Sequence, residues 1–566
     1  MQRKKMLPVG VEDFRDIIQG NFYYVDKTRL LEKLLETGGK VNLFTRPRRF
    51  GKSLNISMMK HFFDIGGTGN LFDGLYISAK QELCDQYMGQ FPVISISLKG
   101  ICGKDFEQAK ALMTRMINEA AREMQYLLKS ERLGEYDLEL YRSLMSVRMD
   151  ETALVYSLRE LTELLYRHYG KKVVVLIDEY DVPLAKANEQ GYYEDMVRLL
   201  RNMFESVLKT NSNLQMAVMT GCLRVAKESI FTGLNNFRVY SITDASFDEY
   251  FGFTDDEVKE MLHYYELDRH YAVVKEWYDG YRFGVTDVYC PWDVICYCDE
   301  HRDHRKKAPQ NYWLNTSGND VIRYFIEHMG QEKEVARSEL EVLINGGCVQ
   351  KEIHEDLTYK ELYESSENIW SILFMTGYLT TRGEKDGQRY DLVIPNQEIC
   401  DIITTHILTL FKEMVRKDGE LLNAFCSALR DGEAELVKNI FTEYLQKTIS
   451  IRDTFVRNDM KENFYHGILL GILGFKTDWN VRSNREAGDG FSDISITMDD
   501  VDIGIVIEIK YGEADDLERE SKKALDQIHD KHYTEQMKQE GIKSVLKYGI
   551  ACNRKQCSVA VVRENI

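Results

Sequence analysis

The fold is decided by one stretch near the start of the chain, Val41-Asn42-Leu43-Phe44-Thr45-Arg46-Pro47-Arg48-Arg49-Phe50-Gly51-Lys52-Ser53. Its first residues form a short, mostly apolar run that is typical of a strand covered on both faces. A helical spacing of apolar residues follows over 54–63. A strand, a short loop, Gly-Lys-Ser and a helix are the context of a phosphate-binding loop, or P-loop. The alternative, a basic turn before a helix, does not explain the preceding strand.

The end of this loop has the residue types that phosphate binding needs. Gly51 allows the backbone to approach a phosphate without a side-chain clash. The helix that follows presents free N–H groups and a partial positive charge. Lys52 can reach the β- and γ-phosphates, and the hydroxyl of Ser53 can bind Mg²⁺. The loop therefore predicts a nucleoside triphosphate with Mg²⁺ as its ligand.

The loop departs from the general pattern at its first position. Where that pattern has a glycine, this chain has Arg46, and Pro47 follows it. The loop is therefore stiffer and more basic than usual. Arg46, Arg48 and Arg49 are our candidates for additional phosphate contacts.

Two carboxylates end a second apolar run. Residues 173–177 are all apolar, and Asp178 and Glu179 follow them. An Asp at the tip of a buried strand that faces a P-loop can hold the Mg²⁺ shell. The next Glu can orient or deprotonate an attacking water. We therefore assign Asp178 as a metal residue and Glu179 as the catalytic base; the alternative is a solvated acidic loop.

A further apolar run, 214–220, ends in Thr220, which stands where a residue sensing the γ-phosphate would be. Arg224 lies just beyond it and can contact phosphate charge in the manner of an arginine finger. Ordinary loop chemistry is an equally good interpretation of both residues.

The order of elements predicts an α/β fold with a parallel sheet. Apolar runs alternate with amphipathic segments that are long enough for crossover helices. The expected strands are 41–44, 92–98, 173–177, 214–220 and 238–242.

Composition sets limits on the function. The 566 residues are too many for one hydrophobic core. The net charge of −18 argues against a general basic coat, so DNA would have to be bound through local basic patches or metal ions. The 11 cysteines are scattered without a Cys-x-x-Cys pair, which favours free thiols in a reducing cytoplasm over structural zinc. No apolar run is suited to a secretory signal or a membrane span, so we expect a cytoplasmic protein.

Several blocks of the first 320 residues resemble the AAA-ATPase-like proteins of bacteria and archaea. They are Leu7-Pro8-Val9-Gly10 with Asp13-Phe14, Tyr24-Val25-Asp26-Lys27-Thr28, the loop 46–53, Ile177-Asp178-Glu179-Tyr180-Asp181, and Thr220-Gly221 through Leu234-Asn235-Asn236. That family has the same arginine in place of the first glycine of the loop. The resemblance implies a P-loop domain over residues 6–245 that binds ATP, and it implies hydrolysis less directly.

Residues 246–452 are expected to form a helical lid and connector. Helical spacing dominates there, and no metal-ligand or nucleophile pattern stands out. A basic run over 301–307 is either solvated surface or a nucleic-acid patch. Such a connector can transmit a nucleotide-dependent motion.

The last segment, 453–566, has a charged pair on an apolar strand. Alternate residues of a strand share a face, so Glu508 and Lys510 lie opposite the isoleucines at 505, 507 and 509. A hairpin brings Asp493 of the preceding strand near Glu508. Adjacent carboxylates repel unless a divalent cation bridges them, and Lys510 can stabilise a hydroxide or the phosphate transition state.

An Asp on one strand, Glu-x-Lys on the next and a helix in front resemble the PD-(D/E)XK nuclease superfamily. The resemblance implies that Asp493 and Glu508 bind Mg²⁺, with Mn²⁺ as an alternative, and that Lys510 is catalytic. It also implies metal binding by Glu486, one strand earlier, and a role for Gln527 on the following helix. Relatives often have Gly-Arg before the Asp, and its absence here puts the DNA contacts in doubt. The plain alternative is a salt-bridged hairpin.

Three functions remain open from the sequence. The first is an ATP-gated, Mg²⁺-dependent DNA nuclease, which the set Asp493, Glu508 and Lys510 favours. The second is a nucleotide switch that binds partners and cleaves nothing, which the acidic net charge favours. The third is an ATPase whose last domain only holds DNA. A homo-oligomer is compatible with all three.

Overall fold

The computed structural model describes residues 4–565 apart from 68, 225–236, 303–306, 314–338, 341, 345, 359–360, 362–364, 383–388, 407–418, 448–457, 475, 477–478, 488–489, 499–500, 531–536, 538–540 and 554. The chain divides into two compact units. The first contains residues 1–316 and 350–399, and the second contains 317–349 and 400–566. The expected boundaries near 245 and 452 fall inside these units and stay predictions.

A five-stranded parallel sheet forms the centre of the first unit. Its order is β2-β3-β4-β1-β5, so β4 lies between β1 and β3. All residues of β1 and β3 are buried, as expected for strands covered on both faces. The predicted α/β fold is confirmed, because each expected strand is present: β1 Val41–Thr45, β2 Val93–Ser97, β3 Val173–Asp178, β4 Leu214–Gly221 and β5 Phe237–Tyr240.

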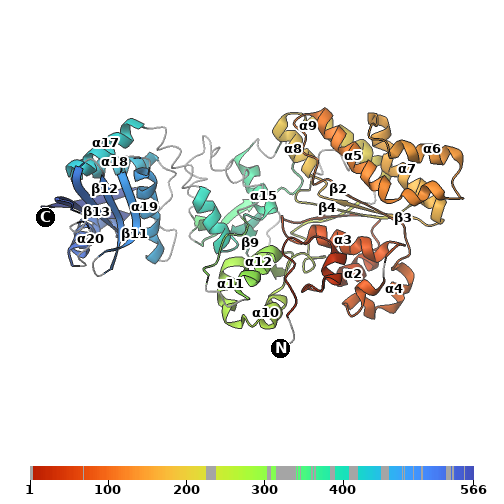
Figure 1. The fold of residues 1–566 in the computed structure, drawn as a ribbon, viewed down its shortest axis with the longest axis horizontal. Helices are drawn as coiled ribbons and strands as arrows, with labels where there is room; N and C mark the ends of the chain where they lie inside the picture. Colours follow the sequence, from red (N-terminus) through yellow and green to blue (C-terminus); the bar gives the residue numbers. More distant parts are fainter. Residues whose placement is uncertain are drawn as a thin grey trace. The chain divides into compact units, whose positions relative to one another are not determined.

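Helices cover both faces of this sheet (Figure 1). On one side lie α5 Phe106–Glu123, α7 Glu151–Tyr169 and α9 Tyr193–Leu208, and on the other lie α2 Arg29–Thr37 and α3 Lys52–Phe63. Local signals fix their ends. The Asp150 side chain accepts a hydrogen bond from the backbone N of Ala153 at the start of α7, and Gly170 ends that helix in the left-handed conformation.

The rest of the first unit is mainly helical, with small antiparallel pieces. It contains α10 Asp255–Tyr264, α11 Tyr271–Tyr278, the hairpin β6 Tyr281–Phe283 and β7 Thr286–Val288, and α12 Pro291–His301. Further on come β8 Val349–Glu352, α15 Ser366–Thr376, β9 Thr380–Thr381 and β10 Arg389–Val393. The helical character confirms the expectation, and the two small sheets were not foreseen.

The second unit is a five-stranded mixed sheet with helices on both faces. The order is β11-β12-β13-β14-β15, and only β13 and β14 pair in parallel among its described neighbours. Among the described helices that precede the sheet are α17 Gly419–Asp431, α18 Ala434–Lys447 and α19 Asn458–Leu473. The strands and last helix are β11 Trp479–Ala487, β12 Gly490–Met498, β13 Val501–Tyr511, α20 Leu517–Asp530, β14 Ser544–Asn553 and β15 Gln556–Asn565.

Strand β13 contributes to two separate cores. Ile505, Ile507 and Ile509 pack with α17, α18 and α19 in one hydrophobic cluster. Val506 packs with Ile528 of α20 in another. This alternation is the one predicted from the sequence, and it turns Glu508 and Lys510 toward the face that α20 covers.

Candidate functional site

The carboxyl ends of β1, β3 and β4 meet at one edge of the first sheet. In parallel α/β sheets this edge is where ligands bind. Thr45 ends β1, Asp178 ends β3, and Thr220 is the penultimate residue of β4. The sequence-predicted residues of the P-loop and of β3 are therefore brought together.

Asp178 joins two hydroxyl groups at this edge. Its Oδ2 accepts a hydrogen bond from Ser53 Oγ at 2.6 Å, and its Oδ1 accepts one from Thr220 Oγ1. Burial raises the pKa of Asp178, although the two hydroxyl hydrogen bonds oppose that shift. Hard oxygen donors of this kind suit Mg²⁺, which usually binds one or two carboxylates and completes its shell with water and phosphate oxygens.

Lys52 is buried beneath the loop that it follows. Its Nζ donates to the carbonyl oxygens of Arg46 and Pro47 at 3.1 and 3.0 Å and lies 3.5 Å from Glu179 Oε1. Burial opposes its positive charge, but the neighbouring acidic groups, Cys222 and Glu179 foremost, outweigh burial and raise the Lys52 pKa. The side chain is therefore a fixed cation within the curve of the loop.

Glu179 has a strained backbone. Its φ of 52° is in the left-handed region, which residues other than glycine seldom adopt. Such strain persists where the surroundings over-determine it, often at functional sites. The carboxylate is directed at Lys52 and remains partly exposed, with 16% side-chain exposure.

The placement of Arg46 differs from the sequence-based expectation. This side chain is fully buried and lies over the rings of Phe251 and Phe283. Its Nη1 donates to the carbonyl oxygens of Thr45 and Tyr240, both at 2.8 Å, and its Nη2 donates to another carbonyl at 3.1 Å. These contacts direct the guanidinium into the protein, so it supports the loop and does not face phosphate.

Arg49 also points away from the expected phosphate position. Its guanidinium lies 4.6 Å from the centre of the Trp292 ring, and its Nη1 donates to the carbonyl oxygen of Tyr312 at 2.5 Å. Arg48, in contrast, is exposed. Of the three arginines predicted to contact phosphate, Arg46 is buried, Arg49 is half-buried and Arg48 is exposed.

Asp181 is a buried acid that the sequence analysis did not assign. Its Oδ2 accepts hydrogen bonds from the backbone N–H groups of Cys222 and Leu223 at 2.9 and 3.0 Å, which ties the segment after β4 to the segment after β3. Burial, assisted by the charge of Glu179, raises the pKa of Asp181 to about 6. A carboxylate two residues after the Glu, in a run that ends a buried strand, was the available signal.

Arg224 is the last described residue before the gap at 225–236. It is half-buried, and its role as an arginine finger stays a prediction. Residues 234–236, which belong to one of the family-like blocks, lie outside the described residues.

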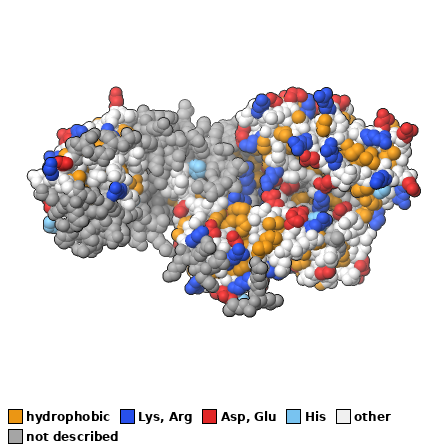
Figure 2. All heavy atoms as spheres, viewed as in Figure 1, with side chains coloured by type: hydrophobic (Ala, Val, Ile, Leu, Met, Phe, Trp, Pro, Cys, Tyr) orange, Lys and Arg blue, Asp and Glu red, His pale blue; other side chains and the backbone are white. Residues whose placement is uncertain are grey.

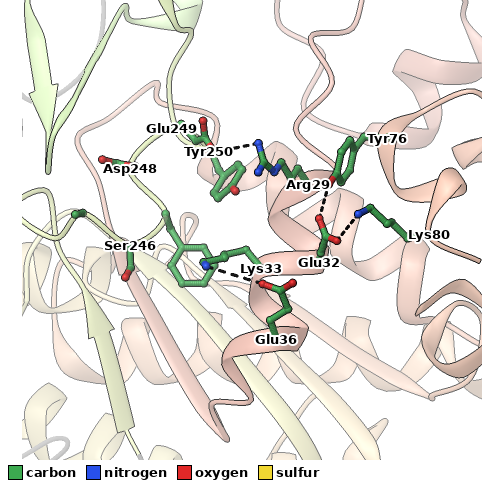
Figure 3. A pocket seen from close by; sticks show the side chains of 12 residues that line it. Arg29, Glu32, Lys33, Glu36, Tyr76, Lys80, Ser246, Asp248, Glu249 and Tyr250 are labelled. Carbon is green, nitrogen blue, oxygen red and sulfur yellow. Dashed lines mark hydrogen bonds and ion pairs between the residues drawn. The ribbon is translucent and has the colours of Figure 1, made fainter. Parts of the chain in front are cut away.

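A cavity of about 490 Å³ lies apart from the P-loop (Figure 3). It is bounded by α2, by Tyr76 and Lys80, and by the segment 245–250. None of its lining residues belongs to the loop 46–53. Apart from Asp248, its charged groups form ion pairs, as in the 2.7 Å pair between Lys80 and Glu32.

In the second unit, Asp493 and Glu508 occupy neighbouring strands. The antiparallel register pairs Ile494 with Ile507, and one further step along both strands places Asp493 beside Glu508. The Oδ2 of Asp493 accepts a hydrogen bond from the backbone N of Ile509 at 2.8 Å. Burial raises the pKa of Asp493, which this hydrogen bond opposes.

Glu508 is held by the two partners that the sequence places around it. Its Oε1 accepts a hydrogen bond from Gln527 Nε2 of α20, and Lys510 Nζ lies 3.6 Å from the same oxygen. The Glu508 side chain is only 3% exposed, whereas Lys510 is 24% exposed. Both contacts are made to Oε1, so one oxygen of the buried carboxylate is held, and the cation of the pair lies toward solvent.

His466 of α19 is a contact that the sequence analysis missed. Its Nε2 donates to the carbonyl oxygen of Asp493 at 2.8 Å and lies 3.1 Å from Ser483 Oγ. A lone histidine on an apolar helix gave no usable signal. Glu486 has its backbone in β11, but its side chain lies outside the described residues, so its metal role stays a prediction.

The donor set of each site fits a hard divalent cation. Within the described part of the chain, no three His, Cys, Asp or Glu side chains converge to hold a metal ion. A cation at either site would therefore draw its remaining ligands from hydroxyl, carbonyl, water or phosphate oxygens. Among the described helices, none has the length and apolar character needed to cross a bilayer.

Known proteins resemble the chain along much of its length. It is 26% identical over 432 residues to a protein of Azotobacter chroococcum mcd 1 described as an uncharacterized protein in the vnfD 5′ region, and the match spans 74% of each chain. The Aeropyrum pernix ORC2 protein, solved as ADPNP-ADP complexes, aligns with 67% of this chain and 92% of its own at 12% identity and a TM-score of 0.24. The latter likeness is too weak to say more about the fold.

Two family models match separate parts of the chain. Residues 8–231 match the model described as a predicted AAA-ATPase, and residues 460–561 match that of the PD-(D/E)XK nuclease superfamily. Each match contains the corresponding cluster, with Lys52 and Asp178 in the first and Asp493 and Glu508 in the second. The chain therefore has an AAA-ATPase-like domain followed by a domain of the PD-(D/E)XK nuclease superfamily.

Proposed function

We propose that this protein binds and hydrolyses ATP with Mg²⁺ and uses the nucleotide state to control a metal-dependent DNA nuclease. The observation that carries the ATP part is the contact between Ser53 and Asp178 beside the buried Lys52. Lys52 and Ser53 begin α3, and Asp178 ends β3, more than 120 residues further along the chain. Their convergence at the ligand-binding edge supports nucleotide binding more strongly than Gly-Lys-Ser alone.

Different residues bind different parts of the nucleotide and its cation. The first turn of α3 and Lys52 hold the phosphates, Ser53 and Asp178 hold the cation, and Thr220 senses the γ-phosphate. Mg²⁺ supplies charge neutralisation at the β- and γ-phosphates. A γ-phosphate is a stronger partner for Lys52 than Glu179 at 3.5 Å, so its binding frees Glu179 to accept a proton from water.

In the second unit Asp493 and Glu508 hold a divalent cation, and Lys510 stands at the solvent side of the pair. Bound by these two carboxylates, a divalent cation would supply acidity to a water and charge stabilisation to the scissile phosphate. Lys510 stabilises the same negative charge. The half-buried Gln527 orients Glu508 through the hydrogen bond to Oε1.

A second candidate function is a nucleotide switch that holds DNA or a protein partner without cutting. Two observations favour it. Gln527 and Lys510 already hold the Oε1 atom of Glu508 without a metal. Basic and acidic side chains intermingle over the described surface in Figure 2, in keeping with the net charge of −18.

Nucleotide binding is tested by titrating the full-length protein with ATP in Mg²⁺. Lys52→Ala should abolish binding, because it removes the buried cation. Lys60→Ala, on the same helix but paired at the surface with Glu123, is the matched control and should bind normally. Normal ATP binding by Lys52→Ala would refute the P-loop assignment.

Nuclease activity is tested by incubating the protein with single- and double-stranded DNA while varying Mg²⁺, Mn²⁺ and ATP. We expect cutting that Asp493→Ala and Glu508→Ala remove and that the exposed-site control Glu518→Ala retains. Cutting that persists in Glu508→Ala would come from another site or a contaminant. Metal-dependent DNA binding without cutting would favour the switch.

A further inference from the structure

Two residues of the P-loop have a left-handed backbone. Gly51 has φ 77°, and Arg49 has φ 70°. Glycine adopts this region freely, whereas a side chain at Cβ crowds the following carbonyl group. Arg49 therefore holds a conformation that its own residue type disfavours, in the middle of the loop assigned to phosphate.

Contacts of the Arg49 side chain compensate for this strain. The guanidinium stacks on Trp292 of α12 at 4.6 Å and donates to the Tyr312 carbonyl oxygen at 2.5 Å. The thiol of Cys290 also approaches the carbonyl oxygen of Arg49, at 3.9 Å. Side chain and backbone of this one residue are thus both held by the segment 290–312.

The neighbouring loop residues also pack against later parts of the first unit. The Phe50 ring lies 5.0 Å from the rings of both Tyr281 and Phe283. A Cβ on Gly377 would lie only 3.0 Å from Pro47 Cβ. The side chains of Pro47 and Phe50 therefore pack against this later part of the first unit. The backbone N–H groups of the loop are the groups that remain to bind phosphate.

From this geometry we infer that Arg49 is a positioning residue whose anchor on Trp292 and Tyr312 holds the loop backbone in the shape that binds phosphate. The inference rests on the proposed ATP function of the loop. Left-handed residues at positions 49 and 51 curve successive N–H groups into a concave anion site. The anchor also makes nucleotide affinity depend on α12.

Glycine substitution separates this role from direct phosphate contact. Arg49→Ala keeps the strained backbone without its anchor, so ATP affinity should fall about 5- to 30-fold. Arg49→Gly removes both anchor and strain and should lose only about two- to fivefold. Arg48→Ala, at the exposed neighbour, measures the effect of losing one positive charge. If Arg49 contacts phosphate, the Ala and Gly variants will lose affinity equally, and the inference fails.

A second arm tests the anchor through its partner. Trp292→Leu should weaken ATP binding in the wild-type chain and have no effect in the Arg49→Gly background, where nothing is left to anchor. Additive effects of the two substitutions would overturn the inference.

A third measurement needs no nucleotide. The thermal midpoint of Arg49→Ala should lie below that of Arg49→Gly, because only alanine retains the strain. The opposite order would overturn the inference. If the wild-type chain binds no ATP, the proposed function fails, and this thermal ranking still tests whether Arg49 carries backbone strain.

Discussion

Replacing Arg46 by alanine should destabilise the first unit strongly, because the side chain holds three carbonyl groups inside the fold. Two of its hydrogen bonds measure 2.8 Å and one 3.1 Å, and they join Thr45 at the end of β1 to Tyr240 and Phe247. A buried acceptor that loses its partner costs about 1–3 kcal/mol. Three such losses give a gross cost of about 3–9 kcal/mol.

Two effects reduce this gross cost. Burial lowers the pKa of Arg46 to about 10, so the buried charge is itself unfavourable and its removal returns part of the loss. Water can also reach some of the freed carbonyl groups. We therefore expect Arg46→Ala to lower the free energy of unfolding by about 3 kcal/mol, at the lower end of the range.

The assay is calorimetry of the full-length protein, following the transition of the first unit without nucleotide. Arg46→Lys keeps the charge but lacks the planar fork, so it should be destabilised to an intermediate degree. A thermal transition of Arg46→Ala equal to that of the wild type, together with lost ATP binding, would refute the structural role and restore the phosphate-ligand interpretation.

Ser53→Ala should leave ATP binding in EDTA unchanged but reduce the Mg²⁺-dependent gain in affinity by about tenfold or more, because the hydroxyl that binds the cation is lost. Equal Mg²⁺ dependence in this variant and the wild type would contradict this. Asp181→Asn tests a titration. In the folded protein the pKa of Asp181 is raised from 3.8 to about 6, so the folded state binds the proton of this carboxyl more tightly than the unfolded state does. The carboxyl therefore lowers the free energy of unfolding increasingly as the pH rises from about 4 to 6. Thermal melts should therefore show Asp181→Asn gaining stability relative to the wild type from pH 4 to pH 7, and a constant difference would exclude the shift. Gln527→Leu should weaken Mn²⁺ binding, measured by electron paramagnetic resonance, about 10- to 100-fold through loss of the hydrogen bond to Glu508; unchanged affinity would show that Gln527 does not orient this carboxylate.

The strands at the two candidate sites were predictable because each carries a strong local pattern. The run 173–177 is wholly apolar and ends in two carboxylates, which marks a covered strand with a functional tip. In β13 the alternation of isoleucine with Glu508 and Lys510 assigned both faces correctly. The helix expected to follow the Glu-x-Lys strand is present as α20, which is described as far as Asp530.

The direction of the loop arginines was not predictable, because it is set by residues distant in sequence. Arg46 binds the carbonyl oxygens of Tyr240 and Phe247, about 200 positions further along the chain. Backbone carbonyl groups carry no sequence signature. Arg49 likewise depends on Trp292 and Tyr312, in a region whose pattern indicated only a helical connector. A basic loop therefore looks like a phosphate site whether its arginines face the ligand or the interior.

The two-sided packing of β13 has a consequence for how this gene can change. Substitutions alter one side chain, but deleting a single codon early in the strand would shift every later residue to the opposite face. Glu508 and Lys510 would then enter the core formed with α17 to α19, and the isoleucines would turn toward α20. We therefore expect insertions and deletions in related sequences to occur in the turns at either end of β13, while the number of residues in the strand itself stays constant.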